Sequence, residues 1–206
     1  MQMMFKNNNF NNTNNPRRVP NPTFQSLMSI NMIKPNINNT FTPAVSLASV
    51  QNGEQVKMKW GEPIWFLFHT LAQKVKEESF ANIKNELLTN ILSICSNLPC
   101  PKCANHAIEY MKKVNFDTIR TKEDLKKMLF LFHNTVNSEK GFPLFEYDKL
   151  DEKYDKANTV NMIHNFIKNF SINDFNVNMI NSNFQRNMLI TKLKVWFTQN
   201  IQYFNQ

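Results

Sequence analysis

Hydrophobic side chains recur at intervals of three and four residues along most of the chain beyond residue 60, which is the spacing of one face of an α-helix. Pro63 and Pro101 stand in the first turns of two such segments, where the missing N–H of proline costs little. Thr121 with Asp124 three residues later resembles a capping box, and Gly141 suits the end of the same segment. The pattern predicts four consecutive helices, over residues 62–78, 83–98, 100–114 and 121–141.

The connections between these segments are short, so we expect an all-α fold built on a four-helix bundle. A short fifth helix is predicted within residues 145–154, and two more near residues 155–170 and 185–204. The last two are too apolar for disorder, and we expect them to pack on the bundle, on each other or across a dimer interface. The predicted organisation is a core domain over residues 53–154 and a C-terminal helical extension over residues 155–206.

The first part of the chain differs from the rest in composition. Residues 1–52 are rich in asparagine and proline and show no sustained hydrophobic period, which predicts a disordered tail. The absence of acidic residues there permits a mitochondrial presequence, but the asparagine bias and the scarcity of arginine argue against one.

Composition narrows the class of protein. The chain has 206 residues, of which 42% are hydrophobic, including 18 Phe, so it can form a substantial core despite a mean hydropathy of -0.46. With only 3 Gly, folds rich in tight hairpins and glycine-rich phosphate loops are disfavoured. No apolar run approaches the roughly 20 residues that a membrane-spanning helix needs, and the first residues lack the apolar core of a signal peptide. We therefore expect a soluble protein that is not secreted.

The formal net charge of +8 is shared unevenly along the sequence. Lys6, Arg17, Arg18 and Lys34 lie in the first fifty residues with no acidic residue among them, so half of the excess belongs to the tail. The predicted folded part is only mildly basic, which argues against nucleic acid as a partner.

Two of the three cysteines form the motif Cys100-Pro-Lys-Cys103 at the start of a predicted helix. Helical geometry brings two cysteines at this spacing into bonding range, and the positive end of the helix dipole stabilises a thiolate at the first position. Such a pair can cycle between dithiol and disulfide, provided that something accepts its electrons.

Two other interpretations of this motif remain open. The two thiols could be ordinary half-buried side chains that have this spacing by coincidence. Alternatively, Cys95, Cys100, Cys103 and His106 could supply three thiolates and an imidazole to a structural zinc ion. Against zinc, all four candidates lie within twelve residues, whereas structural zinc sites usually combine two separated pairs.

Histidine and amide side chains are predicted to face one another across the bundle. His69, His106 and His133 lie on three different predicted helices, and Asn134 and Asn137 follow the last of them. Aromatic and imidazole rings with amide donors around a dithiol suit a planar, anionic cofactor such as a flavin.

Three motifs together resemble the Erv/ALR family of FAD-dependent sulfhydryl oxidases. Residues 60–69 are similar to the family's W-G-x-x-x-W-x-x-x-H opening, in the form with Trp before Gly that is found in its virus-encoded branch. Residues 99–106 are similar to its P-C-x-x-C-A-x-H active site, and residues 133–143 to its H-N-x-V-N-x-x-x-G-K-P signature. The resemblance spans residues 57–154.

The resemblance implies a four-helix bundle with a short fifth helix that holds FAD beside the redox-active disulfide. By motif position, Cys103 would lie next to the flavin and Cys100 would accept attack by the substrate thiol. The residues implied in FAD binding are Trp60, Trp65, His69, His106, His133, Asn134, Asn137, Lys140, Lys153 and Tyr154.

The implied activity is the formation of disulfides in protein substrates, with electrons passing to molecular oxygen to give hydrogen peroxide. The resemblance also implies a homodimer. The virus-like opening motif indicates a host cytoplasm or virion, with the mitochondrial intermembrane space as the alternative location. A catalytically silent relative that serves as an interaction scaffold is a further alternative.

The sequence departs from the family pattern at several positions. Phe142 replaces the lysine of the third motif, and Phe130 and Tyr147 stand where the family has its structural disulfide, so packing must replace that bond. No second cysteine pair is present, so electrons are expected to enter directly at Cys100. Cys95 is predicted to be a buried structural thiol rather than a resolving cysteine.

Overall fold

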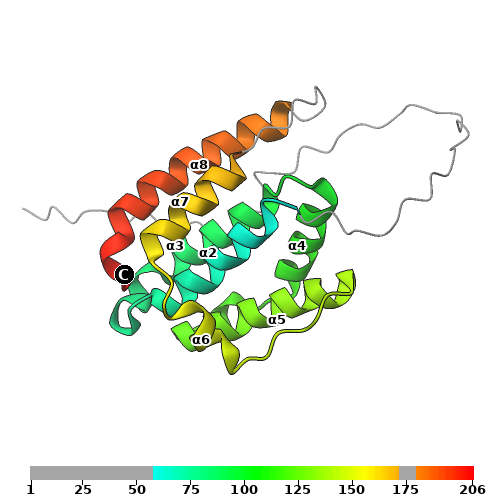
Figure 1. Ribbon diagram of the computed structural model, residues 1–206. Helices are drawn as coiled ribbons and strands as arrows, with labels where there is room; N and C mark the ends of the chain where they lie inside the picture. The colour runs from blue at the N-terminus through cyan, green and yellow to red at the C-terminus, as the bar shows by residue number, and fades with distance from the viewer. Residues whose placement is uncertain (1–57, 172–179) are drawn as a thin grey trace, which may run out of the picture. The chain divides into compact units, whose positions relative to one another are not determined.

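The computed structural model describes residues 58–171 and 180–206, and the predicted tail, residues 1–52, lies outside this part of the chain. The described residues form an all-α fold, as predicted, in one compact unit (Figure 1). Its elements are α2 (Gly61–Lys74), α3 (Glu77–Ser96), α4 (Pro101–Lys113), the 3-10 helix η1 (Phe116–Thr118), α5 (Lys122–Lys140), α6 (Lys149–Tyr154), α7 (Thr159–Phe170), α8 (Ile180–Asn200) and the 3-10 helix η3 (Ile201–Tyr203).

Helix α2 is the centre of the fold, because it packs against α5, α6 and α7 (Figure 1). Helix α3 contacts α4 and α8. The innermost side chains come from every long helix and include Leu67, Phe68, Leu71, Leu87, Ile91, Met111, Leu125, Leu129, Phe166, Phe170 and Leu193. One continuous hydrophobic core therefore joins the bundle to the two C-terminal helices.

The predicted ends of the fourth bundle helix are confirmed. The Thr121 hydroxyl accepts a hydrogen bond from the Asp124 backbone N–H at 3.1 Å, and the Asp124 carboxylate accepts one from the Thr121 N–H at 2.9 Å. These reciprocal bonds satisfy backbone donors at the start of α5. At the other end, Gly141 adopts a left-handed conformation with φ of 69°, which glycine adopts without strain.

The first bundle helix ends earlier than the sequence predicts. Helix α2 stops at Lys74 because the next residues are extended and bond to the C-terminal segment. The Lys76 N–H donates to the Tyr203 carbonyl at 2.9 Å, and Val75 forms an isolated antiparallel bridge with Phe204. These partners lie far away in the sequence, so a local hydrophobic period cannot reveal them.

The C-terminal extension packs on the bundle, which was one of the three predicted arrangements. Helix α7 lies along α2, and its first residue, Thr159, donates a hydrogen bond to the Asn205 carbonyl at 2.6 Å. Further along, the Trp196 indole donates to the Glu86 carboxylate on α3 at 2.6 Å. None of the helices in the described residues is both long and apolar enough to cross a bilayer.

Candidate functional site

A cavity of about 660 Å³ lies among α2, α4, α5 and α6, with contributions from the end of α3. Eight of the ten residues predicted to bind a cofactor line it: Trp60, Trp65, His106, His133, Asn137, Lys140, Lys153 and Tyr154. They come from four helices and from the residue before α2, so the fold brings together positions that are far apart in the sequence.

The two cysteines of the motif have different surroundings. Cys100 is the N-cap of α4, where its sulfur accepts a hydrogen bond from the Cys103 backbone N–H at 3.2 Å. Cys103 lines the cavity, whereas Cys100 does not, and both side chains are half-buried. The helix N-terminus expected from the sequence is thus confirmed, with one sulfur at the cavity wall and the other outside it.

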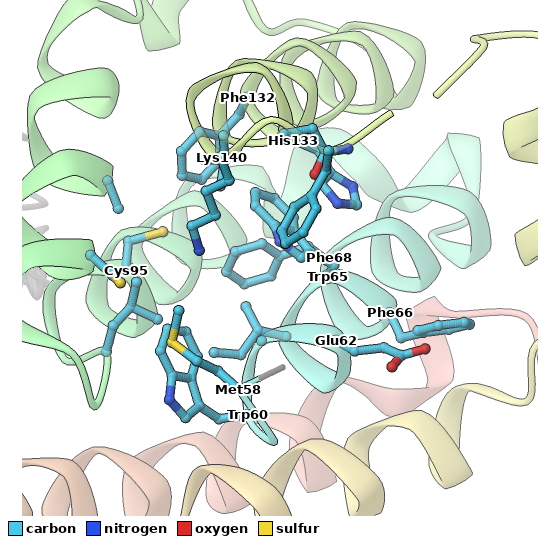
Figure 2. A pocket seen from close by; sticks show the side chains of 18 of the residues that line it. Met58, Trp60, Glu62, Trp65, Phe66, Phe68, Cys95, Phe132, His133 and Lys140 are labelled. Atoms are coloured by element: carbon cyan, nitrogen blue, oxygen red, sulfur yellow. The ribbon is translucent and has the colours of Figure 1, made fainter. Parts of the chain in front are cut away.

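Burial raises the pKa of the Cys103 thiol to about 11, and its hydrogen bond and electrostatic interaction with Cys100 act in the same direction. The ammonium group of Lys140 opposes this shift, because a positive charge favours the thiolate. Lys140 extends from α5 into the space between Cys95 and Trp65 (Figure 2). It is therefore placed to stabilise negative charge that develops inside the cavity.

Flat rings form the wall of the cavity opposite the cysteines (Figure 2). The Trp65 indole stacks on the His133 imidazole, with ring centroids 4.0 Å apart and planes 8° apart. Phe132 and Phe68 support the indole edge-on at 5.0 Å and 6.0 Å. These contacts and the stack on His133 restrict the orientation of Trp65.

His69 and Asn134 do not line the cavity but hold its wall in place. His69 Nε2 lies 3.0 Å from Nδ1 of His133, and its ring stacks on Tyr154 with centroids 4.8 Å apart. The Asn134 side chain bonds to both backbone groups of Phe145, accepting from its N–H and donating to its carbonyl at 2.9 Å. Two lining residues, His133 and Tyr154, therefore depend on a histidine behind them.

The paired histidines are held neutral. Burial, followed by the charges of His133 and Lys153, lowers the pKa of His69 to about 3. Burial and the charge of Lys153 lower the pKa of His133 to about 4. At neutral pH the positive charge of the cavity thus comes from its lysines rather than from these imidazoles.

Lys153 lies within a group of three aromatic rings. Its ammonium nitrogen is 5.2 Å from the ring centroid of Phe66, 4.9 Å from that of Phe145 and 5.4 Å from that of Tyr154. Such contacts hold a cation by cation–π attraction while leaving it able to meet an anion.

His106 of α4 also faces Glu139 of α5, with Nδ1 and Oε2 3.8 Å apart.

About three-fifths of the lining residues were not predicted as site residues from the sequence. They are Met58, Gly61, Glu62, Ile64, Phe66, Phe68, Cys95, Leu98, Ala107, Phe132, Val136, Glu139 and Phe142. Most are apolar, and a hydrophobic period marks such positions only as core. The sequence marked some of these positions only by their spacing. Ile64 and Phe68 share a face of α2, and Phe132 and Val136 share a face of α5.

The zinc alternative finds no support in the described residues, which contain no group of three or more His, Cys, Asp or Glu side chains that could hold a metal ion. Cys95 is 1% exposed, and burial raises the pKa of its thiol to about 12, which disfavours the thiolate that zinc binds. The expectation that Cys95 is a buried thiol is confirmed.

The lining suits a flat molecule that carries negative charge. It combines stacked and tilted aromatic rings, the ammonium groups of Lys140 and Lys153, and the Asn137 amide, all beside one sulfur of a Cys-x-x-Cys. The volume of about 660 Å³ lies in the usual range for small-molecule and cofactor sites. A helical bundle with this site suits a thiol-redox protein that works with a bound cofactor.

A family model matches part of the chain. Residues 62–155 match the model of the Erv1 / Alr family, so this part of the chain is similar to that family. The match covers α2 to α6 and ends before α7. Among solved structures, none matches the chain.

Curated relatives agree with this assignment. The chain is 28% identical over 100 residues to the FAD-linked sulfhydryl oxidase of African swine fever virus (isolate Warthog/Namibia/Wart80/1980), covering 48% of this chain and 83% of the viral protein. It is 27% identical over 120 residues to FAD-linked sulfhydryl oxidase ERV1 of Arabidopsis thaliana, covering 58% of this chain and 62% of the plant protein. A rice protein of the same name is 28% identical over 101 residues, with 48% and 51% covered.

Proposed function

We propose that this protein is an FAD-linked sulfhydryl oxidase that forms disulfides in thiol-containing proteins and passes the electrons to molecular oxygen. The observation that carries the proposal is the position of Cys103, which lies in the wall of a cavity lined by the Trp65–His133 stack and two lysines. Relatives named FAD-linked sulfhydryl oxidases support the activity and the cofactor.

The residues present fit FAD. The flat rings of Trp65, His133 and Tyr154 offer faces for its ring systems, and Lys140 and Lys153 offer positive charge for its phosphates. When bound, FAD supplies an acceptor for two electrons and a route for those electrons to oxygen. In this proposal His69 and Asn134 orient the wall from behind, and Trp60, His106 and Asn137 complete the lining.

The thiol chemistry follows from the different surroundings of the two cysteines. A substrate thiolate attacks the Cys100 sulfur of the oxidised pair, the Cys100–Cys103 bond breaks, and Cys103 leaves as a thiolate. A second substrate thiolate then attacks the substrate sulfur of the mixed disulfide, which releases the oxidised substrate and leaves Cys100 reduced. The pair has now gained the two electrons that the substrate lost. Overall, two substrate thiols and O2 give one disulfide and H2O2.

Lys140 assists the step that releases Cys103. The ordinary tendency of a buried sulfur is to remain protonated, as the raised pKa of Cys103 shows. The charge of Lys140 lowers the cost of the thiolate, so the leaving sulfur can hold negative charge inside the cavity. Cys100, outside the cavity lining, remains the sulfur that a protein substrate can reach.

The setting of this activity is also a proposal. Relatives in African swine fever virus and Invertebrate iridescent virus 3 favour a role in the cytoplasm of an infected cell or in the virion. The mitochondrial intermembrane space is the alternative. We also propose a homodimer, which light scattering during gel filtration measures directly.

The test begins with the purified full chain. We expect a visible flavin absorption band, oxygen uptake in the presence of dithiothreitol and formation of H2O2. Cys103→Ser and Cys100→Ser are expected to abolish turnover, whereas His164→Gln, at an exposed position on α7, serves as the control. A chain that neither carries nor takes up flavin overturns the proposal, and a flavin-loaded chain without oxygen uptake makes the protein a silent scaffold instead.

A further inference from the structure

Arg186 on α8 is almost completely buried, with 2% of its surface exposed. Its Nε donates a hydrogen bond to the Asn97 carbonyl at 3.1 Å, and its Nη1 donates to the Asn183 side-chain oxygen at 3.0 Å. The guanidinium carbon also lies 5.8 Å from the ring centroid of Phe170, at the end of α7. One side chain therefore connects both helices of the C-terminal extension to the end of α3.

The carbonyl that Arg186 holds has a special position in the chain. Asn97 is the C-cap of α3, and only Leu98 and Pro99 separate it from Cys100, the N-cap of α4. Leu98 itself lines the cavity. The Asn97 carbonyl thus lies in the short connection that leads into the Cys-x-x-Cys motif.

The chemistry of this contact is specific to a buried arginine. The last carbonyls of an α-helix lack intrahelical partners, and a cation there is favoured by the negative end of the helix dipole. The planar guanidinium stays charged and donates in fixed directions, so the bonds to Asn97 and Asn183 help to hold it in one orientation. Loss of a buried partner leaves that carbonyl unsatisfied, which favours a movement of the loop toward water.

We propose that Arg186 is a positioning residue for the redox centre: through the Asn97 carbonyl it fixes the α3–α4 connection and so the presentation of Cys100 to attacking thiols. This inference rests on the proposed thiol oxidase function and gives the C-terminal extension a role in it. Disulfide exchange requires the incoming sulfur to approach Cys100 along the bond that breaks, so the rate depends on how that sulfur is held.

The experiment measures the first exchange step without flavin turnover. Oxidised full-length protein is mixed with dithiothreitol in the absence of oxygen, quenched with iodoacetamide, and assayed by mass spectrometry for loss of the Cys100–Cys103 disulfide. Arg186→Met removes the hydrogen bonds at similar volume. Lys74→Met is the matched control, because Lys74 is also buried and also donates to a backbone carbonyl, that of Asp155, but does not line the cavity.

We expect Arg186→Met to lower the second-order rate constant of disulfide reduction about tenfold, since small misplacements of reacting groups have effects of this order. Lys74→Met, compared at a similar loss of thermal stability, is expected to stay within about twofold of the unmodified protein. In turnover assays, the Arg186→Met effect is expected in kcat/KM for the thiol, with the flavin spectrum unchanged. Equal rates for the two variants overturn the positioning role.

A milder variant covers the case in which Arg186→Met does not fold. Asn183→Ala removes the side-chain acceptor of Nη1, and we expect a fall of about threefold in the same rate constant. An unchanged rate in Asn183→Ala would then overturn the inference. Because the assay needs neither flavin nor oxygen, failure of this inference is distinguishable from failure of the oxidase proposal, which the oxygen uptake of the unmodified chain decides.

Discussion

The rings of Phe130 and Tyr147 meet edge to face, with centroids 5.0 Å apart and planes at 83° to each other. Phe130 lies on α5 and Tyr147 in the segment that follows it, where the Tyr147 hydroxyl also donates a hydrogen bond to Glu123. By resemblance, these are the two places at which the family has its structural disulfide. The expectation that packing replaces that bond is confirmed, since all three cysteines of this chain are free thiols located elsewhere.

This aromatic contact predicts a measurable coupling energy. Phe130→Leu and Tyr147→Leu each remove one ring, and the double variant removes both. We expect a coupling of about 1 kcal/mol between the two rings, beyond the effect of buried area alone. Urea unfolding of the four proteins gives the value, and strictly additive losses of stability would contradict it.

The three cysteines should differ in their reaction with iodoacetamide in the reduced, folded protein. Cys95 is buried in the core and its pKa is raised to about 12, so we expect it to remain unmodified at pH 8. Cys100 is half-buried outside the cavity lining and should react first. Peptide mass spectrometry follows each site, and in urea all three should react. Rapid labelling of Cys95 in the folded protein would contradict its buried position.

Lys140→Met should slow the alkylation of Cys103. The charge of Lys140 favours the Cys103 thiolate, so its removal raises the pKa of this thiol further above its ordinary value. Because water screens the charge of Lys140 at this partly exposed sulfur, we expect only a roughly two- to fivefold smaller thiolate fraction at a given pH. The control is Lys102→Met, because Lys102 is exposed and is not among the groups that shift the Cys103 pKa. Equal rates in the two variants would exclude this role for Lys140.

The paired histidines predict a loss of stability in mild acid. Burial lowers the pKa values of His69 and His133 to about 3 and about 4, whereas both are near 6.5 in the unfolded chain. Between about pH 6.5 and 4 the unfolded chain therefore binds protons that the folded chain does not. Stability must fall as the pH falls through this window, by at most about 1.4 kcal/mol per pH unit for each histidine.

Unfolding measured from pH 7 to pH 4.5 tests this prediction. His69→Gln removes one of the two groups, so its stability should depend less steeply on pH than that of the unmodified protein. His164→Gln, which changes an exposed histidine on α7, should leave the slope unchanged. Identical slopes in all three proteins would mean that the histidines take up protons in the folded state as readily as in the unfolded chain.

Local sequence patterns predicted the elements well but not the contacts that close the fold. The period of three and four, the Thr121 cap and Gly141 were enough to place the helices of the bundle, because each of these signals acts within a few residues. The end of α2 was missed because the residues that stop it, Tyr203 and Phe204, belong to the other end of the chain.

The residues of the candidate site were also predicted only in part. Polar and aromatic residues in motifs could be placed by resemblance, and most of them line the cavity. The residues that support this wall from behind could not be predicted. No sequence pattern distinguishes a histidine that bonds to another histidine, as His69 does, from one that faces the cavity. Arg186 carried no signal at all, because a single arginine in a polar stretch of sequence is usually exposed.

The packing of α7 along α2 has a practical consequence for anyone who produces this protein. The part that matches the family model stops at residue 155, yet a polypeptide cut there would leave the apolar side of α2 in water and would lose the residues that bond to Lys74 and Lys76. Such a fragment should aggregate during expression, whereas in a polypeptide that continues to residue 206 the apolar side of α2 stays covered by α7. The segment that matches the family model thus contains the candidate site, whereas the unit that folds also includes the C-terminal helices.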